Sequence, residues 1–277
     1  MKPFAQSGCG RTRVAVLVFL FVIAVIPVSA AERPRTGRAT GVRAPRKIRV
    51  LFIGNSYTYF NNLPELVSEL SSSDPKSPQL ETQMIVRGGA TLRQHWEEGK
   101  ALERIKGSHW DFVVLQDQSM LPITDPEMTK QYARLFDSAI KKAGARTVFF
   151  LTWAHQDKPE TQAKLNETYQ SIARELRALI APVGIAWSRA LKENPRLLLY
   201  MMDKSHPNAA GSYIAACVFY STLVGRAPEG LTCRLSGNPV SISGAVAPDR
   251  VELVNLDADE CRMLQRVSSD SAGMKRE

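Results

Sequence analysis

A serine, a histidine and an aspartate occupy positions from which they could act together as nucleophile, base and orienting acid. Ser56 belongs to the turn Gly54-Asn55-Ser56, which comes directly after the apolar run at residues 50–53. Asp203 and His206 lie three residues apart, just before a helical stretch. A carboxylate at this spacing can hydrogen-bond Nδ1 of the imidazole, so that Nε2 faces the nucleophile and can take its proton. The residue types and their order predict acyl transfer with Ser56 as nucleophile, His206 as base and Asp203 as its partner.

Both segments also have a simpler interpretation. Gly54-Asn55-Ser56 is an ordinary turn sequence. Asp203, Ser205 and Pro207 suit the start of a helix. The start of a helix does not explain why a histidine stands at position 206. For residues 203–207 we therefore favour the catalytic interpretation.

Two further turns could supply hydrogen-bond donors to an oxyanion. Gly88 and Gly89 follow one predicted strand, and Gln116-Asp117-Gln118-Ser119 follows another. Adjacent glycines let the backbone aim an N–H at developing negative charge, and a side-chain amide can donate to the same atom. A plain Gly-Gly connector and a polar strand end are the alternatives.

A third turn carries an aromatic residue and a histidine. Trp153 and His155 follow a predicted strand, where the indole face could stack on a sugar ring; the alternative is a surface loop. The residues predicted to bind substrate are these two and residues beside the other turns, namely Asn55, Tyr57, Gln116 and Asp117. His95 and His109 lie on or beside predicted helices and are expected to pack there instead of acting in catalysis.

These turns can meet only if the strands before them lie side by side. Short apolar runs alternate with segments of helical periodicity, which predicts an α/β fold in three layers around a mostly parallel five-stranded sheet. The predicted strands are residues 48–53, 81–86, 112–115, 147–152 and 183–187. The predicted helices are residues 63–71, 91–105, 126–143, 161–180 and 207–224. Residues 251–256 could add an edge strand, and the polar stretch 268–277 is expected to be frayed. Ligands bind beyond the carboxyl ends of strands in such sheets, where all of these turns lie.

In this order the turns resemble the four blocks of the SGNH (GDSL-like) hydrolase superfamily, which run serine, glycine, asparagine, histidine. Residues 54–56 resemble the first block, with Asn55 in place of the usual Asp. Gly88 or Gly89 matches the second block, and Asp203 with His206-Pro207 matches the last. The third block departs from the pattern, because residues 116–119 stand where the superfamily has Gly-x-Asn-Asp.

The resemblance implies the flavodoxin-like SGNH fold and a serine esterase that needs no metal or organic cofactor. The oxyanion would be held by the N–H of Ser56, the N–H of Gly88 or Gly89 and the amide of Gln118. Glutamine is tolerated near this block in similar subfamilies that act on acetylated sugars, which points to O-acyl esters of carbohydrates. The expected partner is thus a small-molecule or glycan ester. An O-acyltransferase with the same triad and a non-catalytic carbohydrate-binding protein are the alternatives.

The ends of the chain suggest export and a single catalytic domain. Residues 1–30 have basic residues, an apolar run and small residues at 28–30, as in a signal peptide. We expect a basic flexible linker at 31–47, the hydrolase domain at 48–230 and a partly irregular extension at 231–277. The protein would be secreted or periplasmic, without stable membrane insertion once the signal is cleaved; a membrane anchor formed by an uncleaved signal is the alternative.

The formal charge of +9 does not indicate nucleic-acid binding. Three cations belong to the signal and six more crowd residues 33–47, so the rest of the chain is close to charge balance. Neither GxGxxG nor P-loop spacing occurs at residues 54–56 or 88–89, which argues against nucleotide binding. Nothing in the sequence indicates an oligomeric state.

Three cysteines follow the signal, so at most one internal disulfide is possible. Cys233 and Cys261 lie in the irregular C-terminal region and are the best-placed pair, whereas Cys217 lies in an apolar helical stretch and is expected to be a buried thiol. No CxxC metal-binding spacing is present.

Overall fold

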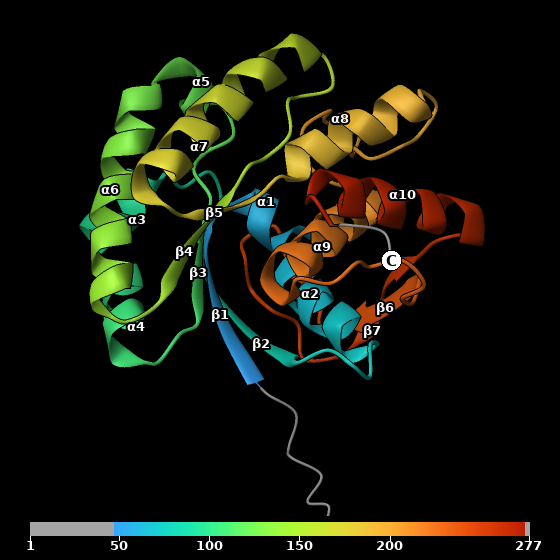
Figure 1. Ribbon diagram of the computed structural model, residues 1–277, viewed down its shortest axis with the longest axis horizontal. Helices are drawn as coiled ribbons and strands as arrows, with labels where there is room; N and C mark the ends of the chain where they lie inside the picture. Colours follow the sequence, from blue (N-terminus) through green and yellow to red (C-terminus); the bar gives the residue numbers. More distant parts are fainter. Residues whose placement is uncertain (1–46, 275–277) are drawn as a thin grey trace, which may run out of the picture. The chain divides into compact units, whose positions relative to one another are not determined.

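A five-stranded, all-parallel sheet with the order β2-β1-β3-β4-β5 forms the centre of the computed structural model, which describes residues 47–274. The strands are β1 (Lys47–Gly54), β2 (Gln79–Val86), β3 (Phe112–Leu115), β4 (Arg146–Phe150) and β5 (Leu179–Ala181). Helices cover both faces of this sheet (Figure 1). The predicted three-layer α/β fold is therefore confirmed.

The two faces of the sheet hold separate apolar cores because successive side chains of a strand point in opposite directions. In β1, Val50 and Phe52 pack with α2 (Leu63–Ser72), α8 (Val183–Glu193), α9 (Ala209–Val224) and α10 (Ala258–Ser271). Leu51 and Ile53 pack on the other face with α3 (Leu92–Glu98), α4 (Lys100–Gly107), α6 (Pro126–Lys142) and α7 (Gln162–Leu176). Burial on both faces explains the continuous apolar run of β1.

The last strand of the sheet lies earlier in the chain than predicted. Residues 183–187, predicted as a strand, form the start of α8, and the strand is Leu179–Ala181. α7 ends at Leu176 because Arg177 takes a left-handed conformation with φ 51°, which breaks the predicted helix 161–180. A strand of three residues is too short to show a period of its own in the sequence.

Three other predictions are corrected. Residues 91–105 form two helices, since Gly99 has a φ of +78° that ends α3. Strand β7 (Val251–Asn255) joins no edge of the main sheet and pairs antiparallel with β6 (Arg234–Gly237). Helix α10 continues to Ser271 with buried hydroxyl side chains at Ser268 and Ser269, so this part of the predicted frayed tail is ordered.

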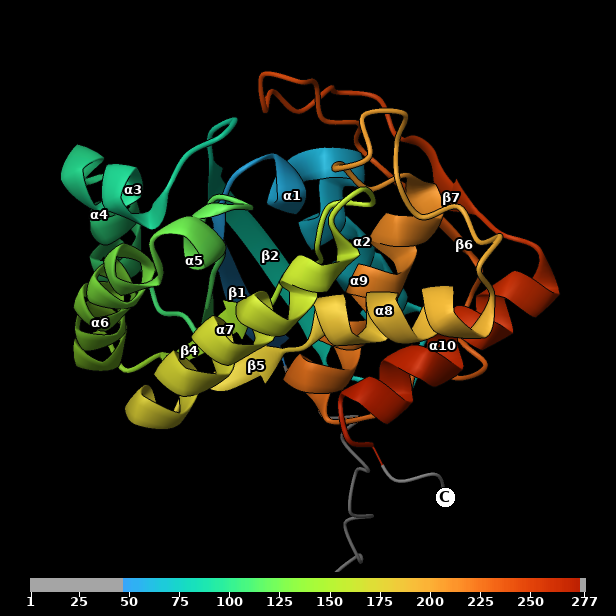
Figure 2. The ribbon, with the colours of Figure 1, turned by 90° about the horizontal axis from the view of Figure 1, so that it is seen from above.

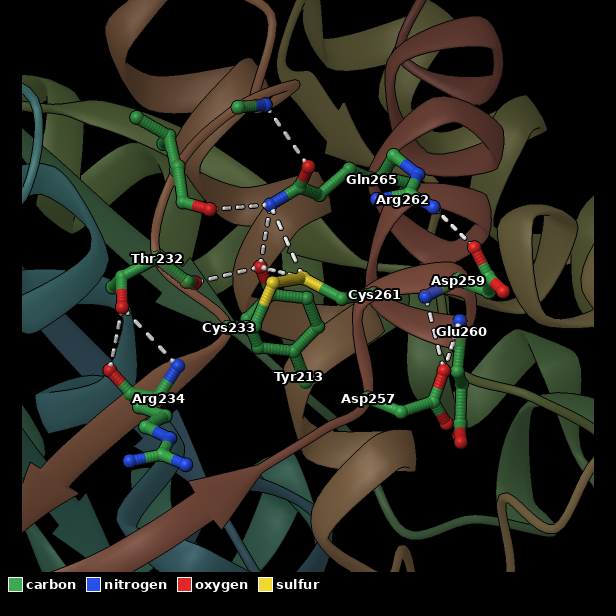
Figure 3. The surroundings of a disulfide bond; sticks show 12 residues. Tyr213, Thr232, Cys233, Arg234, Asp257, Asp259, Glu260, Cys261, Arg262 and Gln265 are labelled. Carbon is green, nitrogen blue, oxygen red and sulfur yellow. Dashed lines mark hydrogen bonds and ion pairs between the residues drawn. A yellow bond between two sulfur atoms is a disulfide. The ribbon is translucent and has the colours of Figure 1, made fainter.

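The predicted disulfide is confirmed. Cys233 and Cys261 are bonded with a Cα–Cα distance of 5.8 Å, and the bond attaches the start of α10 to the segment before β6 (Figure 3). Beside it, Gln265 Nε2 donates to the Tyr213 hydroxyl at 2.8 Å. Cys217 is a free, buried thiol as expected, and burial raises its pKa.

Within residues 47–274, none of the helices has the length and apolar character needed to cross a membrane. The predicted signal peptide and nearly all of the basic linker lie outside the described residues. The predicted domain boundary at residue 230 stays a prediction.

Candidate active site

Ser56, His206 and Asp203 come together at the carboxyl end of the sheet. Ser56 is the first residue of the short helix α1 (Ser56–Tyr59), directly after β1, and His206 lies in the loop before α9. Figure 2 shows α1 at the edge of the molecule where the loops after α8 and β6 also rise. His206 Nε2 is 2.8 Å from Ser56 Oγ, and His206 Nδ1 is 2.6 Å from Asp203 Oδ2. The three side chains thus form one continuous hydrogen-bonded line.

The aspartate is held as an ionised acceptor. Its Oδ1 accepts the backbone N–H of Ser205 at 3.0 Å and of His206 at 2.9 Å. Partial burial alone would raise the pKa of Asp203, but the hydrogen bonds from the His206 ring and these two N–H groups outweigh it and leave that pKa below its ordinary value. An ionised Asp203 keeps the proton of neutral His206 on Nδ1, which leaves Nε2 unprotonated toward Ser56.

Aromatic rings fix the plane of the imidazole. The Phe60 ring stacks on His206 at a centroid distance of 4.2 Å, and the Tyr57 and His206 rings make a T-shaped contact at a centroid distance of 5.6 Å. The backbone N–H of Met201 donates to the carbonyl of His206 at 2.8 Å, which closes the loop on itself. Restricted motion of the ring favours the geometry needed for proton transfer.

The glycine turn lies beside the serine. The N–H of Ala90 donates to the carbonyl of Arg87 at 3.1 Å, and Gly89 has a φ of +66°, which glycine adopts readily. Asn55 Nδ2 donates to the carbonyl of Ala90 at 2.9 Å and so attaches this turn to the segment that carries Ser56. Gly88 and Gly89 are both exposed residues of this turn.

Gln118 has a fixed side-chain amide. Its Oε1 accepts the N–H of Met120 at 2.8 Å and of Leu121 at 3.0 Å, while Nε2 donates to Ser119 Oγ at 3.2 Å. Among the contacts of residues 47–274, the bond to Ser119 uses one of the two hydrogens on Gln118 Nε2, and the other hydrogen has no partner. A half-buried amide held in this way is preorganised to donate the other one.

Three residues predicted to bind substrate instead hold these turns together. Asn55, Gln116 and Asp117 are at most 2% exposed. Gln116 Oε1 accepts the N–H of Asn55 and the hydroxyl of Thr58, both at 2.9 Å. Buried polar atoms that already have protein partners are not available to a substrate, so the predicted contacts are wrong for this trio.

Asp117 joins the glycine turn to the third block. Its Oδ1 accepts the N–H of Leu92 at 2.9 Å and of Gln118 at 2.8 Å, and its Oδ2 accepts the Thr129 hydroxyl at 2.8 Å. Burial raises the pKa of this carboxyl. Asp117 therefore orders both turns without reaching the surface.

The predicted stacking of Trp153 on a sugar is also wrong. Trp153 is 1% exposed, and its ring lies between Tyr57 at 4.6 Å and Trp187 at 4.1 Å, stacked on both. Tyr57 is buried as well and supports the His206 loop through a 2.7 Å hydrogen bond to Ser205 Oγ. Neither ring has a face for a ligand, because both are part of the core.

His155 remains at the site. It is half-buried, and its Nε2 lies 3.2 Å from Ser205 Oγ and 3.4 Å from Ser119 Oγ. Ser119, Ser205 and Phe60 were not among the residues predicted to form the site. The only signal for them was their position next to Gln118, His206 and the α1 segment.

Exposed apolar side chains lie on the loops next to the site. Met201 and Met202 are 47% and 100% exposed on the loop that carries His206. Ile242 is 84% exposed on a second loop, whose carbonyl at Ile242 accepts the Tyr59 hydroxyl at 2.5 Å. Among residues 47–274, no group of three or more His, Cys, Asp or Glu side chains is arranged to hold a metal ion.

Comparison with known proteins places the chain in a family through its structure. No family model matches the sequence, and no curated protein matches it. A solved structure assigned as an SGNH hydrolase from Slackia heliotrinireducens is 28% identical with a TM-score of 0.57, over 64% of this chain and 100% of the other. A DUF4886 family protein from Bacteroides uniformis has a TM-score of 0.57 at 17% identity, over 81% of this chain and 94% of the other. An acetyl xylan esterase has a TM-score of 0.53 at 18% identity, over 64% and 100% of the two chains. The chain belongs to the SGNH (GDSL-like) hydrolase superfamily.

Proposed function

We propose that this protein is an exported serine esterase that removes O-acyl groups, acetyl above all, from carbohydrates. The hydrogen-bonded line from Asp203 through His206 to Ser56 carries the proposal, with distances of 2.6 and 2.8 Å. Residues of these types at hydrogen-bonding distance suit nucleophilic acyl transfer. The similar acetyl xylan esterase structure supports an ester substrate and favours a carbohydrate alcohol.

In the first half of the reaction, Ser56 Oγ attacks the ester carbonyl while His206 Nε2 takes the serine proton. The negative charge of Asp203 stabilises the imidazolium. The tetrahedral intermediate collapses when His206 gives its proton to the departing alcohol oxygen. Ser56 then carries the acyl group as an ester. Water attacks this acyl-enzyme with His206 again as base and releases the carboxylic acid.

Three donors would stabilise the oxyanion of each tetrahedral intermediate. These are the N–H of Ser56, the N–H of Gly88 or Gly89 and the free N–H of the Gln118 amide. A preorganised donor of this kind lowers the barrier by about 3 kcal/mol. The longer glutamine side chain fits this role because Met120 and Leu121 hold its oxygen.

Two parts of the proposal, export and hydrolysis, rest on arguments other than the geometry of the site. Export follows from residues 1–30 and agrees with a disulfide between Cys233 and Cys261. Hydrolysis is favoured over transfer to a second sugar because water needs no acceptor site. An O-acyltransferase would use the same three side chains, and analysis of the acyl products with and without an added sugar acceptor separates the two reactions.

The test is turnover of p-nitrophenyl acetate and of an acetylated xylan by the purified protein and by Ser56→Ala. We expect release of acetate from both substrates by the wild type and loss of at least about 10³-fold in the variant. Equal rates in both proteins would contradict the proposal, and an unchanged melting temperature would show that the variant is folded.

A further inference from the structure

Four side chains, one from helix α1 and one from each of three loops, form a hydrogen-bonded cluster next to Ser56 and His206. The Tyr57 hydroxyl is 2.7 Å from Ser205 Oγ, and His155 Nε2 is 3.2 Å from Ser205 Oγ and 3.4 Å from Ser119 Oγ. We call Tyr57, Ser119, His155 and Ser205 the hydroxyl cluster. Gln118 Nε2 extends it by its 3.2 Å contact with Ser119.

The hydroxyl cluster is anchored at one end and accessible at the other. Tyr57 is 2% exposed, whereas Ser119, His155 and Ser205 are half-buried. Trp153 Nε1 donates to the carbonyl of Ser205 at 2.9 Å, and this bond fixes the backbone of Ser205. The accessible polar atoms are thus fixed on a rigid base, as a binding site requires.

The hydroxyl cluster joins the loop that carries the catalytic base to the loop that carries the expected oxyanion donor. Ser205 precedes the base His206, and Ser119 follows the oxyanion donor Gln118. The cluster therefore adjoins both the catalytic base and the expected oxyanion donor. Desolvation lowers the pKa of His155, which makes a neutral imidazole the dominant form at pH 7. A neutral imidazole and two serine hydroxyls offer both donors and acceptors without net charge.

We propose that Ser119, His155 and Ser205 bind a hydroxyl group of the alcohol part of the ester, on the carbon next to the ester-bearing one. The acetyl carbonyl oxygen is taken up by the oxyanion donors and the acetyl methyl group forms no hydrogen bonds, so the alcohol part is the part of the ester that can engage the cluster. Uncharged groups that donate and accept suit a sugar hydroxyl better than a carboxylate or phosphate. This subsite rests on the proposed esterase function and deepens it by selecting vicinal diols as the alcohol class.

The experiment compares two substrates across three proteins. One substrate is a monoacetylated methyl pyranoside with a free hydroxyl next to the ester, and the other is its deoxy analogue without that hydroxyl. The wild type should prefer the first by about tenfold in kcat/KM, as for one or two hydrogen bonds in a partly enclosed site. His155→Ala should reduce this preference to about twofold or less. The matched control His109→Ala, at an exposed histidine on another edge, should keep the wild-type preference.

Ser119→Ala provides a second variant in case His155→Ala does not fold, and it should reduce the preference in the same direction. A general structural defect would lower both kcat/KM values together and leave their ratio unchanged. A wild type without the preference, or folded variants that keep it, would overturn the subsite. If p-nitrophenyl acetate is still cleaved in a Ser56-dependent way, the esterase proposal survives that failure. If Ser56→Ala changes nothing, the esterase proposal itself has failed.

Discussion

The substitution Asp203→Asn changes the triad by one atom and so isolates what the carboxylate does. In the wild type, Oδ1 accepts two backbone N–H groups and Oδ2 accepts His206 Nδ1. An asparagine that keeps its oxygen on the two N–H groups must point its NH₂ at Nδ1. His206 then has to accept at Nδ1 and carry its proton on Nε2, where it cannot act as the base for Ser56.

The size of the effect follows from the cost of the alternative orientation. If the introduced asparagine amide rotates by 180°, its oxygen accepts from His206 Nδ1 and restores the active tautomer. This rotation breaks the two hydrogen bonds from the N–H groups of Ser205 and His206 and places the amide NH₂ against them, at a cost of about 3 kcal/mol. This reduces the active tautomer by about 100-fold. Loss of the charge beside the imidazolium adds about 1 kcal/mol, because the Asp203 side chain is 49% exposed and water screens it. Together these give a decrease in kcat of about 10³-fold.

The assay is steady-state hydrolysis of p-nitrophenyl acetate between pH 5 and pH 8. The hydrogen bonds to Asp203 hold its pKa below the ordinary value, so the wild-type carboxylate stays ionised throughout this range. Asp249→Asn, an exposed aspartate in another loop, is the matched control and should keep wild-type activity. A decrease of less than about tenfold in Asp203→Asn would refute the tautomer argument.

Three further outcomes are expected. Gln118→Ala should lower kcat by about 100-fold with little change in melting temperature if its amide is an oxyanion donor; a change below about threefold in steady-state kinetics would remove it from the site. Replacing Cys233 and Cys261 together by serine should lower the free energy of unfolding by about 2–4 kcal/mol in urea titrations, since the bond closes a loop across a 28-residue separation, and an unchanged midpoint would argue against that bond. Trp153→Ala should cost about 3–5 kcal/mol of stability because both ring faces are packed, whereas a stable variant with a raised KM only for sugar esters would restore the surface interpretation.

The fold was largely predictable because β1 and β3 are buried on both faces and read as continuous apolar runs. The position of the fifth strand, β5, was not predictable, because the apolar residues from 179 to 187 contain both a three-residue strand and the start of a helix. Periodicity cannot separate these over so short a range. The positive φ of Arg177, which ends α7, has no distinctive signature in the sequence.

The residues of the site were likewise predictable only in part. Ser56, Asp203 and His206 could be located because each follows a strand or precedes a helix in a recognisable order. Asn55 and Gln116 were misassigned because the sequence shows a polar residue but not its partner. Their partners lie 35 to 62 residues away and are known only from the tertiary structure.

The central claim is that Ser56 is a nucleophile activated by His206, and covalent labelling tests it most directly. The full chain is treated with a p-nitrophenyl alkylphosphonate, and intact mass spectrometry with peptide mapping locates the adduct. We expect one phosphonyl group per molecule on Ser56, no adduct in Ser56→Ala and labelling slowed by at least about 100-fold in His206→Ala. No adduct in the wild type, or an adduct on another residue that persists in Ser56→Ala, would contradict the account.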